Sequence, residues 1–247
     1  MQTGGNQQTS LQGRRVVVAG GTSGIGFAVA QAAAHAGAEV TIASSNAQRV
    51  HSALEQLPAG ARGEALDFTN EASVKAFFDK VGAFDHLVYT AGESLFLQTV
   101  AEMSIEEARK AFDVRYWGAV TAVKYATPHL RTGGSITLTS GVASTRPLPT
   151  WVVPSSILGA MESLTRALAV ELAPLRVNAV APGVLRTNLW SNMTEDDRNG
   201  LYEFIAGKMP VQRVGEASDV AQTYLYLMQQ GFCTGQVLVV DGGHVLV

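Results

Sequence analysis

The chain alternates short apolar runs with longer stretches in which apolar residues recur at helical spacing, and this alternation predicts its secondary structure. The apolar runs predict β-strands at residues 15–19, 39–43, 86–90, 135–139, 177–181 and 237–240. Residues 27–36 are rich in small side chains and predict a helix that ends at Gly37. Because strands separated by helices pair in parallel and are covered on both faces, we expect a doubly wound, three-layer α/β/α fold.

The composition restricts these 247 residues to a few classes of protein. Hydrophobic residues make up 47% of the chain, so we expect one domain over residues 11–247, preceded by a flexible polar tail at residues 1–10. The net charge is −3 without a charge run, which favours neither nucleic acid nor a membrane surface as a partner. No apolar run is long enough to span a bilayer. The single cysteine, Cys233, excludes an internal disulfide, and we expect a cytoplasmic protein.

A metal site is not expected from this sequence. The lone cysteine provides no thiolate cluster. The five histidines follow no metal-ligand spacing; they are His35, His51, His86, His129 and His244.

A glycine-rich turn follows the first predicted strand. Residues 20–26 read GGTSGIG, and the predicted helix follows them directly. Glycines at a strand-to-helix turn permit close backbone approach to a pyrophosphate, and the helix N-terminus presents free N–H groups to the anion. The position of the turn favours a dinucleotide site, and the alternative is a tight turn with no ligand.

This glycine-rich loop resembles the nucleotide loop of the short-chain dehydrogenase/reductase family, and the resemblance extends over residues 11–246. Asp67 resembles the adenine-contacting aspartate, and residues 89–92 (YTAG) stand where the family usually has Asn-Asn-Ala-Gly. Pro182, Gly183 and Thr187 resemble the loop on the nicotinamide side. The resemblance implies a Rossmann-type fold and a dinucleotide cofactor. The implied cofactor-binding residues are Gly20, Thr22, Ser23, Gly24, Ile25, Gly26, Ser44, Ser45, Asn46, Asp67, Phe68, Ala91, Gly92, Pro182, Gly183 and Thr187.

The residues after the second predicted strand indicate which dinucleotide is preferred. An acidic residue there binds the ribose 2′-hydroxyl of NAD and repels a 2′-phosphate. This chain has Ser44, Ser45 and Asn46 instead, with Arg49 nearby. We therefore expect NADP(H), and the alternative is a neutral loop that discriminates weakly.

The resemblance breaks down at the catalytic residues. Residues 164–174 (LTRALAVELAP) match the end of the family's active-site helix, which places the family tyrosine at Pro154 and the lysine at Leu158. The family asparagine falls at Arg115, and of the four catalytic residues only Ser140 remains. A ketone that accepts hydride becomes an alkoxide and needs a proton, whereas an iminium becomes a neutral amine without one.

Arg115 and Ser140 are the residues that we expect to carry the chemistry. A guanidinium is a fixed cation with several donors, suited to a substrate carboxylate, carbonyl or enolate. Its alternative role is a structural salt bridge or a cap on a backbone carbonyl. Ser140 is expected to bond a substrate oxygen, and its alternative role is to cap the loop after its strand.

Residues 184–215 are expected to form a lid over a small hydrophobic substrate. Apolar side chains that would form its wall are Leu189, Trp190, Met193, Leu201 and Phe204. Ordinary packing onto the domain is the alternative.

Two apolar surfaces indicate a homo-oligomer, with a tetramer as the expected state. One is a stripe at helical spacing formed by Ile157, Met161, Leu164 and Leu168, which is typical of a core or a dimer face. The other is the C-terminal segment, residues 237–247. Two distinct patches permit a tetramer with D₂ symmetry.

Smaller motifs resemble a divergent subgroup of the family whose fungal members act in alkaloid assembly. These motifs are FAVA, SSN, VRYWG, SITLTSG and Trp151. The resemblance implies an atypical NADP(H)-dependent oxidoreductase acting on a hydrophobic imine, iminium or activated C=C bond. Two alternatives stay open: a cofactor-assisted cyclase that uses the same cavity, and a non-catalytic NADP(H)-binding sensor or oligomer partner.

Overall fold

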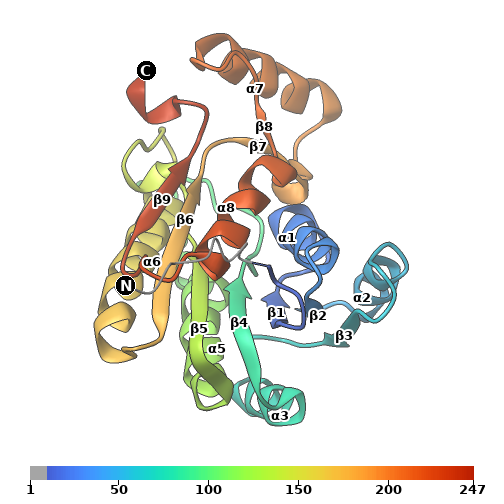
Figure 1. Cartoon of the computed structure of the whole chain (residues 1–247). Coiled ribbons are helices and arrows are strands. Elements are labelled where there is room, and N and C mark those ends of the chain that lie inside the picture. The colour runs from blue at the N-terminus through green and yellow to red at the C-terminus, as the bar shows by residue number, and fades with distance from the viewer. Residues whose placement is uncertain (1–9) are drawn as a thin grey trace.

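The computed structural model describes residues 10–247 and contains a central seven-stranded parallel sheet. Its strand order is β3-β2-β1-β4-β5-β6-β9 (Figure 1). The strands are β1 (Arg15–Ala19), β2 (Glu39–Ser44), β3 (Arg62–Ala65), β4 (Phe84–Tyr89), β5 (Leu130–Thr139), β6 (Arg176–Pro182) and β9 (Val237–Val240). The expected α/β/α architecture is confirmed. The expected tail lies, except for Ser10, outside the described residues.

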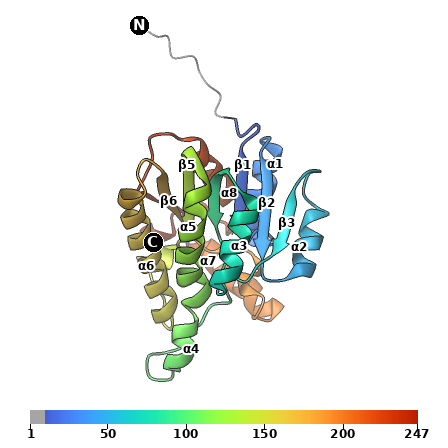
Figure 2. The ribbon, with the colours of Figure 1, turned by 90° about the horizontal axis from the view of Figure 1, so that it is seen from below.

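Helices cover both faces of the sheet. One face carries α1 (Gly24–His35), α2 (Ala47–Leu54) and α8 (Ala217–Gln229), and the other carries α3 (Glu71–Val81), α5 (Ala119–Ala126) and α6 (Val152–Glu171). Figure 2 shows α6, α5 and α3 in a row across the second face. The shorter α4 (Ile105–Lys110) precedes α5.

Strand alternation explains how one sequence run fills two cores. In β1, Val16 and Val18 pack under α1 and α8, whereas Val17 and Ala19 pack under the helices of the opposite face. Successive side chains of a strand point to opposite faces, so a strand that is buried on both sides must be apolar throughout. The run RVVVA meets that requirement, which is why its apolar pattern predicted β1 with the correct bounds.

Other predicted bounds differ from the structure where polar residues extend or replace an apolar run. β5 begins at Leu130 rather than at residue 135. Its first residues lie at the exposed end of the sheet, so they show no apolar run that would predict a strand. The edge strand β3 has the sequence RGEA and offered no apolar pattern. Helix α1 begins at Gly24, inside the glycine-rich turn, rather than at residue 27.

The segment that was expected to form a lid lies beyond the carboxyl ends of the strands. It contains β7 (Leu185–Arg186), the short helical turn η4 (Asn188–Trp190), α7 (Glu195–Lys208) and the start of β8 (Gly215–Glu216). Thr194 caps α7, because its hydroxyl oxygen accepts from the Asp197 N–H at 3.2 Å. Figure 1 shows α7 at the top of the molecule, away from the sheet. A small separate core holds the segment together, formed by Trp190, Tyr202, Ile205, Met209 and Val214.

The apolar stripe on α6 belongs to the main core. Ile157 and Met161 are buried, and Leu164 and Leu168 pack against the same cluster. Ile157 and Met161 are thus core residues, as the alternative allowed, and an assembly role for the partly buried Leu164 and Leu168 stays a prediction. The large apolar side chains of α6 that are exposed are Val152 and Val170.

None of the helices between residues 10 and 247 combines the length and hydropathy that a bilayer crossing requires.

Candidate active site

A polar cleft of about 570 Å³ opens where the strand order reverses between β1 and β4. Ligands of doubly wound sheets bind in this crevice, outside the carboxyl ends of the strands. The structure brings thirteen of the sixteen predicted cofactor residues to its wall. They are Gly20, Thr22, Ser23, Gly24, Ile25, Gly26, Ser44, Ser45, Asp67, Phe68, Ala91, Gly92 and Thr187.

The N-terminus of α1 forms the floor of this cleft and is suited to an anion. Ser23 has extended backbone geometry at the N-cap, yet its side chain does not cap the helix. No acidic residue occupies the first turn. The first N–H groups are therefore available, and the helix dipole favours a negative group beside them.

Close contact between two loops shapes the crevice. Gly20 has φ +82°, and a Cβ there would lie 2.6 Å from the backbone nitrogen of Ala91. No other residue type fits this contact, because a side chain would force the loops after β1 and β4 apart. The predicted role of this glycine in a tight strand-to-helix turn agrees with its conformation.

The end of β2 carries hydroxyl groups and a cation. Ser44 and Ser45 line the cleft together with Arg49, and Thr22 donates to the Ser44 hydroxyl at 3.1 Å. No carboxylate follows β2 at this wall. Asn46 does not line the cleft. Its side chain caps α2 instead, by accepting from the Arg49 N–H at 2.9 Å. Arg49 lines the cleft where Asn46 was predicted to do so. The sequence indicated Arg49 only by its position close to residues 44–46.

A second, apolar cavity of about 280 Å³ adjoins the cleft. Trp151 and Trp190 lie on its wall with ring centroids 6.3 Å apart. The remaining residues predicted on the nicotinamide side, Pro182 and Gly183, line this cavity, and Thr187 lines both spaces. The segment 184–215 therefore supplies an apolar wall, as expected. Its lining residues include Leu189, Trp190, Met193, Leu201 and Ile205.

Phe204 was predicted to belong to this wall, but it does not line the cavity. Its side chain is exposed, and its ring lies under the ammonium group of Lys208 at 4.0 Å. In α7 the residues Leu201 and Ile205 share the inward face, one turn apart, so Phe204 is directed away from the cavity.

Helix α6 presents apolar residues to the site. Pro154 is buried in its first turn, where the missing N–H breaks no helical hydrogen bond. Leu158 follows one turn later and lines the apolar cavity. Neither side chain has an ionisable proton. The ionisable residues on the wall of this cavity are Arg115, Arg146 and His244.

Arg115 lies at the junction of the two cavities and lines both. It belongs to a π-helical turn, η1 (Asp113–Gly118), in which the N–H of Trp117 donates to the carbonyl of Phe112. Such turns rotate side chains out of α-helical register and are frequent at functional sites. The π-helical turn thus directs the Arg115 side chain to the two cavities, although the helix that follows packs on the sheet.

The guanidinium of Arg115 is only partly used within the protein. Its Nη2 donates to the backbone carbonyl of Glu93, and no salt bridge of Arg115 occurs among residues 10–247. Burial lowers the pKa of this guanidinium, although the Glu93 carboxylate opposes the effect. An arginine nevertheless stays charged in proteins. Its remaining N–H groups suit an anion or carbonyl.

Ser140 follows β5 and lines the apolar cavity, and its hydroxyl has two acceptors within the protein. The hydroxyl donates to Glu162 Oε1 at 3.0 Å, with the carbonyl of Leu158 as a second acceptor at 3.2 Å. The expected bond to a substrate oxygen stays a prediction; because the one hydroxyl proton has protein acceptors, the substrate oxygen would have to be the donor.

His244 is a site residue that the sequence analysis missed. It lies in the turn η5 (His244–Leu246) and lines the apolar cavity. Burial lowers the pKa of its imidazole, so the neutral form dominates near pH 7. The only signal in the sequence was its position directly after residues 241–243 (DGG). In the described part of the chain, no group of histidine, cysteine, aspartate or glutamate has the arrangement of a metal site.

Comparison with known proteins agrees with this geometry. Residues 19–244 match a protein family described as enoyl-(acyl carrier protein) reductase. A short-chain dehydrogenase/reductase, ucsE from Acremonium sp, is 36% identical, with 96% of this chain and 97% of the relative covered. The short-chain dehydrogenase/reductase malC from Malbranchea aurantiaca is 31% identical, with 96% of each chain covered.

Solved structures are similar over the same length. A small-chain dehydrogenase in complex with NADPH has 40% identity and a TM-score of 0.85, with 96% of this chain and all of that chain covered. The MalC reductase/Diels-Alderase from Malbranchea aurantiaca has a TM-score of 0.90 at 31% identity, with 96% of this chain and 98% of that chain covered.

Proposed function

Because the chain belongs to the short-chain dehydrogenase/reductase family, we propose that it is an atypical NADP(H)-dependent oxidoreductase. Its substrate is a hydrophobic imine or iminium, or an activated C=C bond. The observation that carries this proposal is the apolar cavity beside the cofactor cleft, whose wall has Leu158 and no tyrosine or lysine within the described residues.

The cleft fits NADP(H). The uncapped N-terminus of α1 suits the pyrophosphate, and Asp67 and Phe68 line the space for the adenine. Ser44, Ser45 and Arg49 offer donors for a 2′-phosphate. The NADPH complex of a similar protein supports this assignment. When bound, NADPH supplies a hydride, and the residues of this chain must orient the acceptor and control its charge.

The chemistry of the wall favours a substrate that needs no proton. A ketone requires an acid at the developing alkoxide, and general acid catalysis typically contributes ~10²–10⁴ in rate. By the resemblance to the family, Pro154 and Leu158 stand where the tyrosine and lysine are expected. Arg115 provides a fixed positive charge but not a practical acid. An iminium carbon accepts hydride and yields a neutral amine, so orientation and electrostatics suffice.

A cofactor-assisted cyclisation in the same cavity is a second candidate. It is supported by the similarity to a reductase/Diels-Alderase and by the two tryptophans on the cavity wall. An enclosed apolar wall can hold a folded substrate in a reactive conformation without any acid or base.

Two assays test the proposed oxidoreductase function. Titration of the protein with NADPH and NADH, followed by nucleotide fluorescence, should give tighter binding of NADPH. Oxidation of NADPH should occur with the cyclic imine 3,4-dihydroisoquinoline and be slow with its carbocyclic ketone counterpart 1-tetralone. Turnover of the ketone near ~10 s⁻¹, a typical enzyme value, would refute the proposal and indicate another proton donor.

We also propose that the protein is a cytoplasmic homotetramer. Exposed apolar side chains near the C-terminal edge of the sheet support one interface; they are Tyr226, Phe232, Val239, Leu246 and Val247. Exposed Trp117 and Val170 offer a second one. Light scattering should give four times the mass of the 26.1 kDa chain, and a monomer at micromolar concentration contradicts this.

A further inference from the structure

We infer that Glu162 fixes the Ser140 hydroxyl as a hydrogen-bond acceptor toward the apolar cavity. The site thereby selects ligands that present an N–H donor or a cationic nitrogen over oxygen isosteres of the same shape. This inference deepens the proposed function and rests on it for the assignment of the cavity to C=N substrates.

The two hydrogen-bond partners of the Ser140 hydroxyl group are both acceptors. Glu162 Oε1 lies 3.0 Å from Ser140 Oγ, and the carbonyl oxygen of Leu158 lies 3.2 Å away. A carboxylate and a backbone carbonyl have no proton to give. The hydroxyl therefore donates inward to α6, whichever of the two it uses. Its oxygen lone pairs receive no hydrogen bond from residues 10–247 and are left for a ligand.

The carboxylate of Glu162 is itself held in place. Its Oε1 also accepts from the Ser144 hydroxyl at 2.5 Å. Ser144 lies in the turn η3 (Val142–Ser144), directly after Ser140, and Glu162 lies one helical turn after Leu158 on α6. The carboxylate thus joins the loop after β5 to the helix that packs beside it. A hydrogen bond to an ionised acceptor is roughly twice as strong as a neutral one, so the inward orientation is the favoured one.

This orientation gives the cavity a polarity. A ketone or ether oxygen near Ser140 would place acceptor against acceptor, whereas an ammonium or protonated imine donates to the free lone pairs. The nearby negative charge of Glu162 favours a positive nitrogen further. Arg115 lines the same cavity and presents donors, which suit a carbonyl or carboxylate. The matching substrate class is an apolar ring system that carries a basic nitrogen and a separate acceptor oxygen.

Binding of two matched probes tests the inference without turnover. The amine 1,2,3,4-tetrahydroisoquinoline and its ether isostere isochroman are titrated into the NADP⁺-loaded protein by calorimetry at neutral pH. The wild-type protein should prefer the amine by about tenfold or more, the usual effect of a hydrogen bond to a charged group. Glu162→Gln should bring this preference close to one, because its amide N–H can donate to Ser140 and turn the hydroxyl proton outward.

Control variants separate this role from a structural one. Ser140→Ala removes the acceptor and should also abolish the preference, which keeps the test decisive if the Glu162 variant does not fold. Glu171→Gln at the exposed end of α6 removes a charge elsewhere, and Ser156→Ala removes an α6 hydroxyl that bonds Val152 at 2.8 Å. Both should keep the wild-type preference.

The possible results are distinct. An unchanged preference in Glu162→Gln, or no preference in the wild-type protein, overturns the inference. Reduction of 3,4-dihydroisoquinoline with an unaltered preference in the variant refutes the inference and leaves the proposed function intact. A Glu162-dependent preference for the amine in a protein that reduces no imine refutes the proposed function and leaves this polarity in place.

Discussion

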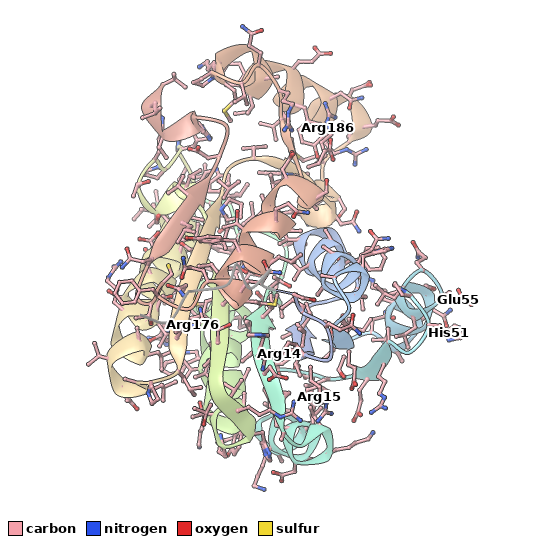
Figure 3. All side chains as sticks on the ribbon, in the orientation of Figure 1. Arg14, Arg15, His51, Glu55, Arg176 and Arg186 are labelled. Atoms are coloured by element: carbon pink, nitrogen blue, oxygen red, sulfur yellow. The ribbon has the colours of Figure 1, made fainter. Side chains whose placement is uncertain are left out.

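Buried polar groups are paired differently at the two ends of the strands, the amino end (the amino edge) and the carboxyl end (the carboxyl edge). At the amino edge, Asp85 is 2% exposed and accepts from the Arg15 N–H at 2.9 Å, from Arg14 at 3.0 Å and from Arg131 at 2.9 Å. Arg176 nearby donates to the carbonyls at the end of α8. Figure 3 shows Arg14, Arg15 and Arg176 toward this side of the molecule, away from Arg186 beside α7.

At the carboxyl ends of the strands, Arg115 bonds one neutral carbonyl within residues 10–247, and the Ser140 lone pairs accept no hydrogen bond from those residues. A saturated network contributes to stability, because each buried group has its partner. Groups whose partners are incomplete contribute less to stability and have capacity for a ligand. The comparison teaches that substitutions at the amino edge should change unfolding, whereas those at the carboxyl edge should change binding.

Arg115→Met provides the largest test of this separation. Binding of 2-naphthoate to the NADP⁺-loaded protein should weaken by about 2–5 kcal/mol, because truncation leaves the buried anion unpaired. The free energy of unfolding should fall by about 1 kcal/mol, for one lost hydrogen bond. Calorimetry and chemical denaturation measure the two quantities. Arg146→Met is the matched control, since it removes the other arginine on the cavity wall. Strong destabilisation with unaltered binding would make Arg115 a structural cation.

The pH dependence of unfolding tests the amino edge through His86. Burial lowers the pKa of its imidazole to about 4, and its Nδ1 lies 2.9 Å from the Ser135 hydroxyl. The unfolded chain, with a pKa near 6.5, therefore takes up the proton first as the pH falls. Stability is fully present above about pH 6.5 and should decrease by up to about 3 kcal/mol toward pH 4. Denaturation curves of His86→Asn should show a shallower decrease over this range. An identical pH profile in the variant would contradict the assignment.

Asp85→Ala should destabilise the protein by about 2–3 kcal/mol, because it leaves the partly buried Arg15 N–H without its acceptor. Burial raises the pKa of Asp85, but the hydrogen bonds from Arg15 and Arg14 and the charge of Arg131 outweigh it, so the pKa is lowered. The contribution is therefore present above the ordinary carboxyl pKa and is lost as the pH falls below about 4. NADPH affinity should not change. A large loss of NADPH affinity in the folded variant would break the separation between the edges.

Arg49→Gln should have the smallest effect. Arg49 lines the cleft and has no salt bridge among the described residues, so its charge is available to a 2′-phosphate. The variant should lose about 1 kcal/mol of NADPH binding, as for a partly solvated charge pair, and keep its NADH affinity. Equal losses for both nucleotides would indicate that Arg49 does not contact the phosphate.

The sequence predicted most of the fold and the cofactor cleft, because both depend on local patterns. The valine-rich β1 and the loop at residues 20–26 each carry their own signal. The orientation of a hydroxyl carries no such local signal. Ser140 contacts Glu162, which lies 22 positions further along the chain, and the residues around neither one indicate this contact. Phe204 was misassigned because a helix of mixed pattern does not reveal which of its apolar residues faces inward. His244 was missed because a single histidine has no spacing to indicate it.

The contact between Gly92 and Arg115 links these two positions. A Cβ at position 92 would lie 2.6 Å from the Arg115 guanidinium carbon, so the planar group occupies the space that a side chain would need. A larger residue at 92 would therefore displace the Arg115 guanidinium from this pose. Among divergent relatives, these two positions should vary together: chains with a larger residue at 92 should carry a shorter residue at 115, and the reverse combination should be rare.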